Sequence, residues 1–197
     1  MDERPRRTQA ERTAATRALL VDAAFACLLE KGYGATTVGA VQERAGVARG
    51  TLLHHFPTRA ALMVGVVEDI AARRLAVLAS DAGPPPGHGW DAVVDLVWRD
   101  LQSPAFLAAL ELWVAARTDD ALREALVPLQ ARLFGAIHRA VTALIGDDPR
   151  APTLVQFTID LLTGTTMTGM LGPGREQTAV VVERWKETLV TLTGPAL

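Results

Sequence analysis

The sequence has a single cysteine, few aromatic side chains and no long apolar run. One cysteine, Cys27, excludes an internal disulfide, and its place in an apolar helical pattern is typical of a small buried residue. No stretch reaches the ~18 consecutive apolar residues of a membrane-spanning helix, and the N-terminus lacks the apolar segment of a secretion signal. We therefore expect a cytoplasmic protein that does not associate with membranes.

Motifs for catalysis and for cofactor or metal binding are also missing. No glycine-rich loop has the pattern of a phosphate-binding site, and Cys27 has no evident general base. The adjacent His54 and His55 lack the four-residue spacing and the neighbouring carboxylate of a helical zinc site. We expect no enzyme activity, no cofactor and no bound metal.

The charge is small overall but unevenly distributed. The 197 residues carry a formal net charge of −2. Residues 1–60 hold nine basic and six acidic side chains, a balance of +3, whereas the remainder holds eleven basic and sixteen acidic, a balance of −5. This pattern suits a DNA-binding segment followed by a separate domain. The arginine-rich arm, residues 1–10, is expected to be disordered, and it either reaches along the DNA or is a solvated tail.

Residues 36–59, TTVGAVQERAGVARGTLLHHFPTR, predict two short helices joined by a tight turn. Thr36 or Thr37 can cap the first helix, because a threonine hydroxyl accepts a hydrogen bond from a free backbone N–H. Apolar residues then recur every three or four positions, as on one face of a helix. Gly46 follows them and suits a left-handed helix end.

The second helix of this pattern is expected to begin near Ala48. Residues Ala48, Leu52 and Phe56 are four apart, so they should share its inner face. Pro57 ends the helix, and Thr58 can cap the next one. The outer positions are small or polar. Such a pair is a helix-turn-helix, whose second helix can enter the major groove of DNA.

Residues 32–62 closely resemble the DNA-binding domain of the TetR family of bacterial regulators, through G-Y-G-A-T-T-V followed by A-G-V-A-R-G-T-L-L-H-H-F-P-T-R-A-A-L. Beyond this segment the resemblance is limited to length and helical layout. It implies a DNA-binding domain over residues 1–57 and a helical effector-binding and dimerisation domain over 58–197. It also implies a homodimeric, ligand-released repressor whose partners are a double-stranded DNA operator and a small-molecule effector.

The predicted DNA contacts divide into base contacts and phosphate contacts. Arg49 can donate to guanine or to phosphate, and Thr51 can touch a thymine methyl group or bind phosphate. By resemblance, Thr37 and Arg59 match family positions that clamp the DNA backbone. Leu53 stands where the family usually has tyrosine, and leucine cannot form the hydrogen bond to phosphate that a phenol can. The full predicted set is Thr36, Thr37, Arg49, Gly50, Thr51, Leu53, His54, His55 and Arg59.

Helical periodicity covers the rest of the chain, apart from a break rich in proline and glycine at residues 81–89. We found no pattern that predicts a strand, so we expect an all-α fold of about nine helices. Besides the helix-turn-helix, helices are expected over residues 11–31, 58–80, 90–101, 104 onward, 119–145, 151–171 and 176–191.

Aromatic, sulfur and polar side chains of the middle helices are candidates for lining an effector pocket. Ordinary core packing is the alternative for each of them. Glu111 and Asp160 lie in otherwise apolar helices, where they either pair with arginines or meet a polar group of the effector. The candidate pocket residues are Trp98, Phe106, Trp113, Phe134, His138, Thr163, Met167 and Met170.

The last two helices are expected to pair with those of a second copy as a four-helix bundle. The candidate interface residues are Thr158, Leu161, Thr165, Gly169, Val181, Trp185 and Leu189. The alternative function is a helical small-molecule binding protein, or an enzyme, that does not use its DNA module.

Overall fold

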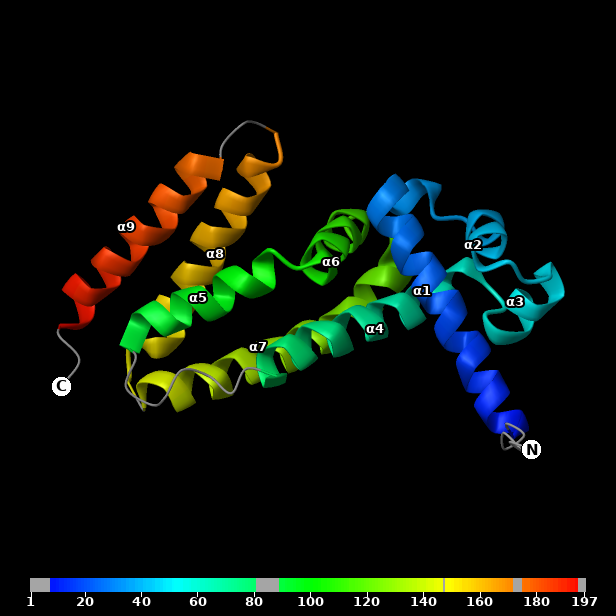
Figure 1. Cartoon of the computed structure of the whole chain (residues 1–197), viewed down its shortest axis with the longest axis horizontal. Coiled ribbons are helices and arrows are strands. Elements are labelled where there is room, and N and C mark those ends of the chain that lie inside the picture. The colour runs from blue at the N-terminus through cyan, green and yellow to red at the C-terminus, as the bar shows by residue number, and fades with distance from the viewer. Residues whose placement is uncertain (1–7, 81–88, 147, 172–174, 195–197) are drawn as a thin grey trace, which may run out of the picture. The chain divides into compact units, whose positions relative to one another are not determined.

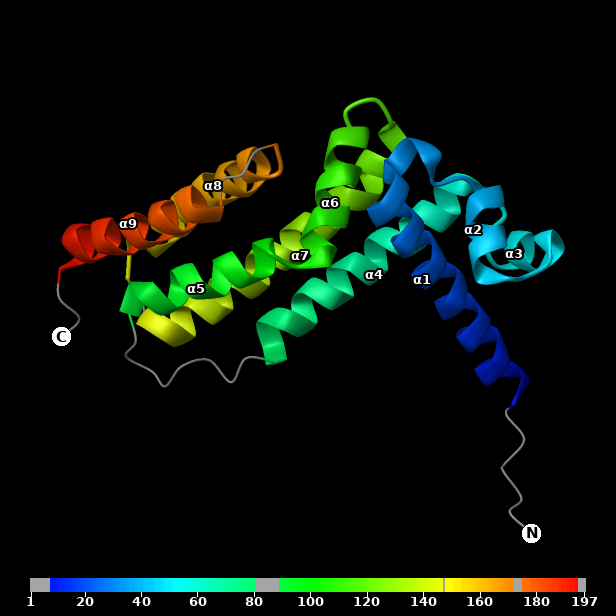
Figure 2. The same cartoon turned by 45° about the horizontal axis from the view of Figure 1, so that its top comes forward.

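A computed structural model describes residues 8–80, 89–146, 148–171 and 175–194, and every regular element in these ranges is a helix (Figures 1 and 2). This confirms the predicted all-α fold. Residues 1–7 and 81–88, which hold most of the predicted arm and loop, lie outside the described residues. None of the described helices is long and apolar enough to span a membrane. The helices are α1 (Gln9–Ala35), α2 (Val38–Ala45), α3 (Arg49–His55), α4 (Arg59–Ser80), α5 (Gly89–Leu101), α6 (Pro104–Ala115), α7 (Asp120–Ile145), α8 (Ala151–Gly169) and α9 (Arg175–Thr193).

The described helices form two compact units. Unit 1 combines the chain up to Ile70 with Ala108–Leu129, and unit 2 combines Ala71–Leu107 with the chain from Gln130 onward. Helices α4, α6 and α7 each supply residues to both units. The boundary between residues 57 and 58 stays a prediction.

In unit 1, α1 begins earlier than expected. The Thr8 hydroxyl accepts the Glu11 N–H at 3.2 Å, while the Glu11 carboxylate accepts the Thr8 N–H at 2.7 Å. This reciprocal cap satisfies two backbone donors at the helix end. Residues 9 and 10 are therefore helical, contrary to the predicted disorder. The regular helix is interrupted at Gly32, whose φ of 73° lies in the left-handed region that favours glycine.

In unit 2, α5 packs against α8 and α9, and α8 packs against α9. The α8–α9 pair runs side by side in both views (Figures 1 and 2). Apolar side chains of these three helices supply buried residues to the core of the unit. They include Val93, Val94, Val97, Leu154, Leu162, Val182 and Leu189.

A buried ion pair lies within this apolar unit. Arg74 of α4 donates from Nε to Asp100 Oδ1 of α5 at 3.1 Å and from Nη2 to Oδ2 at 2.5 Å. Their side chains are only 6% and 4% exposed. The guanidinium carbon also lies 5.4 Å from the centre of the Phe106 ring. Two parallel hydrogen bonds compensate for the loss of water around both charges, so this pair fixes α4 to α5.

Candidate DNA-binding and effector sites

The helix-turn-helix forms as the sequence predicted. The structure shows which of the two threonines, Thr36 or Thr37, caps its first helix. Thr37 is the capping residue of α2, and its hydroxyl accepts the Ala40 N–H at 3.2 Å. Gly46 ends the helix with φ 65° and ψ 30°, and its N–H donates to the carbonyls of Gln42 and Glu43. A left-handed residue here turns the chain sharply into α3.

Helix α3 has a buried side and an exposed polar side. Leu52 and Phe56 are buried, as predicted, whereas Ala48 is exposed because it precedes the first turn of the helix. The outer face is largely accessible. Arg49, Gly50, Thr51 and His54 are exposed, and Leu53 and His55 are half-buried. Seven residues give about two turns, enough to place several side chains along a groove.

Thr36 and Arg59 differ from the expectation that they contact DNA. Thr36 is fully buried, and its hydroxyl donates to the Gly32 carbonyl at 2.8 Å. Arg59 is half-buried and donates to the carbonyls of Tyr33 at 2.7 Å and Thr36 at 3.1 Å. Its guanidinium lies 4.1 Å from the centre of the Tyr33 ring. Both side chains therefore hold the α1–α2 junction together instead of pointing freely outward.

Tyr33 connects this junction to α6 and α7 within unit 1. Its hydroxyl donates to Asp119 Oδ2 at 2.5 Å, and Asp119 Oδ1 caps α7 by accepting the Leu122 N–H at 3.0 Å. The Tyr33 N–H donates to Glu111 Oε2 at 3.3 Å. Glu111 therefore meets a backbone donor of this junction, which neither predicted role for it included. The link joins residues far apart in the sequence, so helical periodicity gave no signal for it.

Burial and hydrogen bonding in this link shift two pKa values in opposite directions. Burial, followed by the hydrogen bond to Asp119, raises the pKa of Tyr33. The hydrogen bond from Tyr33, followed by the N–H of Leu122, lowers the pKa of Asp119. At neutral pH the pair is therefore a phenol donating to a carboxylate, the charge-assisted form of the bond.

We predict that Tyr33→Phe destabilises the protein by about 1 kcal/mol, because the ring stays over Arg59 but the hydrogen bond to Asp119 is lost. Asp119 has a lowered pKa when folded, so its contribution is present above the ordinary value of about 3.9 and is lost as pH falls through the folded value. Urea unfolding at pH 7 and at successively lower pH measures the difference between the two proteins. A gap that does not shrink in acid would contradict this role.

A cleft of about 600 Å³ lies among α5, α8 and α9 of unit 2, within the size range of small-molecule sites. Lys186 of α9 spans it, with Nζ 2.7 Å from Asp95 Oδ1 of α5 and 3.1 Å from Glu183 Oε1. The cleft is lined by Asp95, Trp98, Leu101, Gln102, Leu107, Thr165, Thr166, Gly169, Met170, Thr178, Ala179, Val182, Glu183 and Lys186.

Only Trp98 and Met170 of the eight predicted pocket residues line this cleft. Phe106 is fully buried beside Arg74. Trp113 belongs to unit 1, so it is not part of this cleft. The remaining four, Phe134, His138, Thr163 and Met167, lie on α7 or α8 and are exposed or half-buried away from the cleft lining. Asp160 is exposed and accepts a hydrogen bond from Gln156 at 2.8 Å.

Two predicted interface residues are buried within the chain, and a third, Trp185, is half-buried and bonded to one of them. Thr158 and Leu189 are fully buried, and Trp185 donates from Nε1 to the Thr158 hydroxyl at 2.9 Å. These contacts join α8 to α9 of the same chain. Helical spacing predicts that residues share one side of a helix, but it does not tell an inner face from an interface.

A different side of α8 is apolar and exposed. Residues spaced by three or four positions share this side, and we call them the α8 stripe. Leu161 at 39% and Phe157 at 53% exposure are its large members. The α8 stripe consists of Phe157, Leu161, Gly164 and Thr168, and the 93% exposed Leu171 follows two residues after the end of α8.

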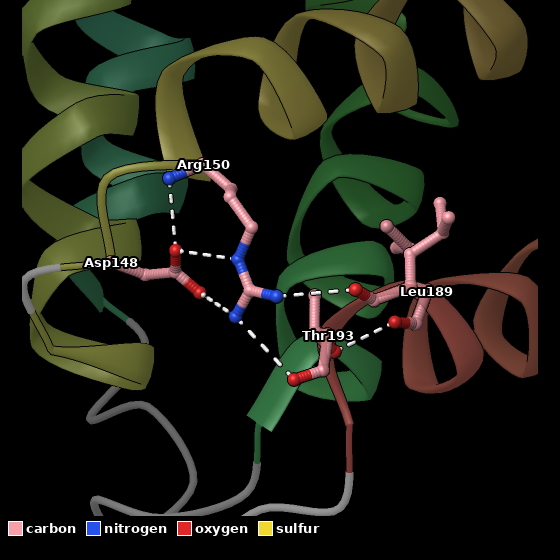
Figure 3. Close-up of polar contacts among 5 residues, drawn as sticks. Asp148, Arg150, Leu189 and Thr193 are labelled. Atoms are coloured by element: carbon pink, nitrogen blue, oxygen red, sulfur yellow. Dashed lines mark hydrogen bonds and ion pairs between the residues drawn. The ribbon is translucent and has the colours of Figure 1, made fainter.

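Figure 3 shows the contacts that join the residues just before α8 to the C-terminal end of α9. Arg150, just before α8, donates to the Leu192 carbonyl at 3.1 Å and the Thr193 carbonyl at 3.4 Å, near the end of α9. Asp148 orients the guanidinium through contacts of 3.0 and 2.8 Å. The side-chain and backbone hydrogen bonds from Arg150 lower the pKa of Asp148. A cation at a helix C-terminus satisfies its free carbonyls.

Both parts of the chain match known families. Residues 20–66 match the model of bacterial regulatory proteins of the tetR family, and residues 84–191 match the tetracyclin repressor-like C-terminal domain. An uncharacterized HTH-type transcriptional regulator of Mycobacterium tuberculosis, Rv2912c, is 32% identical over 142 residues, 71% of this chain and 73% of the relative. The HTH-type transcriptional regulator CymR of Pseudomonas putida is 38% identical over 123 residues, 60% of each chain.

Solved structures share the fold at lower identity. A transcriptional regulator from Rhodococcus has a TM-score of 0.73 at 19% identity, over 89% of this chain and 96% of that one. The multidrug binding protein EbrR, complexed with ethidium, has a TM-score of 0.65 at 22% identity, over 90% and 98% of the two chains. Because the helix-turn-helix geometry, both family models and the M. tuberculosis relative agree, the chain belongs to the TetR family of helix-turn-helix transcriptional regulators.

Proposed function

We propose that the protein is a cytoplasmic repressor that binds a roughly palindromic operator as a homodimer and is released by a small-molecule effector. The observation that carries this is α3, which buries Leu52 and exposes Arg49, Gly50 and Thr51. In a two-fold dimer, two copies of such a helix enter major grooves about 34 Å apart, or a small multiple of that. The relative AcnR of Corynebacterium diphtheriae, 26% identical over 127 residues, bears the name of a transcriptional repressor.

The contacts we propose follow from exposure and chemistry. Arg49 reads a base, and Gly50 lets the backbone approach closely. Thr51 and Leu53 meet thymine methyl groups or sugars. Backbone phosphates accept hydrogen bonds from Thr37, His54 and His55. Thr36 and Arg59 are left out of this set because their side chains bind the module's own carbonyls.

We predict that Arg49→Ala weakens specific operator binding by ~1–3 kcal/mol and relaxes the preference at one base pair. Gel shifts with promoter DNA beside the protein's own gene, and with operator variants, measure both effects. Arg44→Ala is the matched control, because it removes the same charge from the neighbouring α2 but its guanidinium is held by Glu30 at 2.6 and 2.7 Å. An equal loss on every DNA sequence would make Arg49 a phosphate contact.

The dimer interface that we propose is the α8 stripe together with exposed apolar residues of α9 such as Val180, which is 62% exposed. Exposed apolar rows on paired helices are the surfaces that a four-helix bundle buries. Thr158, Trp185 and Leu189 support this surface from within the chain.

Effector release, in this proposal, is a shift between two populations. The effector binds the α5–α8–α9 cleft and favours a dimer in which the two copies of α3 are wrongly spaced for the operator. DNA affinity falls only as far as the effector prefers that state over the DNA-binding state. A protein that binds small molecules but shifts no promoter DNA would replace this proposal with that of a binding protein whose DNA module is unused.

A further inference from the structure

The α5–α8–α9 cleft has more negative than positive charge. Its lining includes the carboxylates of Asp95 and Glu183 and one ammonium, that of Lys186. The formal balance of these three groups is −1. Among the lining residues that the structure describes no other is charged, since the rest are apolar, glycine, threonine, glutamine and tryptophan.

The ammonium is less available to a ligand than the carboxylates. The Lys186 side chain is 17% exposed, whereas Asp95 is 51% and Glu183 is 69% exposed. Both carboxylates contact Nζ, so Lys186 is already compensated within the chain. Burial opposes the charge on Lys186, but its hydrogen bonds to Asp95 and Glu183 outweigh burial and raise its pKa. A ligand entering the cleft therefore meets carboxylate oxygens before it meets a free cation.

The remaining walls suit a flat or bulky apolar body. Trp98 is half-buried, Leu107 and Met170 are partly exposed, and Leu101 and Val182 close the interior. An indole face attracts cations through its negative π surface, and a thioether packs favourably against aromatic rings. The carboxylates and the apolar walls thus both favour a cation with an apolar, aromatic body.

We propose that this cleft binds small molecules that carry a single positive charge on an apolar, aromatic body. The carboxylates of Asp95 and Glu183 would face the charge, and Trp98 would pack on the body. The proposal specifies the effector class of the proposed function, but cation binding itself requires no DNA. The cleft lies within one chain and shares no member with the α8 stripe, so dimerisation through that stripe does not use its lining.

The test compares two ions of nearly equal shape and opposite charge. Tetraphenylphosphonium and tetraphenylborate are titrated separately into the full-length protein by calorimetry, without DNA. Tetraphenylphosphonium is expected to bind at least tenfold more tightly than tetraphenylborate, because the net negative charge of the cleft attracts the cation and repels the anion. Solvent exposure of the carboxylates screens this electrostatic preference and limits its size. Equal binding of both ions, or no binding of tetraphenylphosphonium, would overturn the proposal.

Three variants on α9 locate the site. Glu183→Gln should weaken tetraphenylphosphonium binding about tenfold, and Lys186→Met should strengthen it by a similar factor, because removing the ammonium leaves two unpaired carboxylates. Glu187→Gln is the matched control: it makes the same change one turn along α9, where Glu187 pairs with Arg184 outside the cleft lining, and should change affinity less than twofold. Melting curves check that each variant is folded.

The opposite signs of the first two variants separate this proposal from its competitor. If Lys186 anchors anionic ligands, tetraphenylborate binds preferentially and Lys186→Met abolishes its binding, which would refute a cation site. Adding promoter DNA afterwards tests the proposed function independently. Tetraphenylphosphonium binding without release of DNA would remove the proposed effector role and leave the cation site standing. A protein that binds promoter DNA but does not bind tetraphenylphosphonium would refute the cation site and leave the proposed regulatory function standing.

Discussion

Replacing Leu161 with glutamate is expected to convert the proposed dimer into monomers and to abolish specific operator binding. Leu161 lies in the middle of the α8 stripe and is 39% exposed in the single chain, so the substitution leaves the chain's own core intact. In a two-fold interface it places two carboxylates in an apolar contact, and each unpaired buried charge costs several kcal/mol. Dimer affinity should fall by more than about 100-fold, the equivalent of roughly 2.7 kcal/mol. Light scattering and gel shifts measure the two losses.

The matched control for this substitution is Val127→Glu. Val127 lies on α7 in unit 1 and is 61% exposed. The same chemical change there should therefore leave the protein dimeric by light scattering. Trp185→Glu would be a poorer test, because it also breaks the hydrogen bond to Thr158 inside the chain. A Leu161→Glu protein that remains dimeric and folded would exclude the α8 stripe as the interface.

Removing the carboxylate of Asp100 should have the largest effect on stability of any single change considered for unit 2. Asp100→Ala leaves the Arg74 guanidinium buried without its bidentate partner, and breaking a buried pair in this way costs ~3–5 kcal/mol. Urea unfolding followed by circular dichroism measures the loss. The cost arises from a buried guanidinium that has lost this carboxylate more than from the net value of the pair.

A double substitution separates these two contributions. Arg74→Met with Asp100→Leu removes both charges and keeps apolar volume, and such replacements of buried ion pairs are often close to neutral. The double variant should therefore be more stable than Asp100→Ala, although it also loses the guanidinium contact with Phe106. A single variant that costs less than about 1 kcal/mol would show that solvent or another group compensates Arg74.

The helix-turn-helix was predictable because its signals are local. The Thr37 cap acts on a residue three positions away, and Gly46 accepts a backbone conformation that other residues rarely adopt. The four-residue spacing of Leu52 and Phe56 identifies the buried side of α3 without knowledge of its partner. These rules predicted which residues α3 exposes, and the structure agrees for Arg49 and Thr51.

The roles of individual side chains beyond this local pattern were harder to predict. Arg59 matches a family position that clamps DNA, yet here it bonds the carbonyls of Tyr33 and Thr36. Its alternative partners are far away in the sequence, so no periodic pattern could indicate them. In the same way, the predicted effector pocket combined Trp98 and Met170, which line the cleft, with six residues that do not.

The sequence by itself predicted the all-α fold and the exposed face of α3, because each depends on spacing and capping within a few residues, and its resemblance over residues 32–62 indicated the family. Tertiary structure decided which helix faces are buried in the core of the chain. It buried Thr158 and Leu189 between α8 and α9 and left Leu161 exposed, although all three have helical spacing. It also brought the Arg74 side chain to Asp100 and Lys186 to Asp95. A helical pattern specifies the direction of a side chain relative to its own axis, whereas burial and charge pairing depend on which other helix lies opposite.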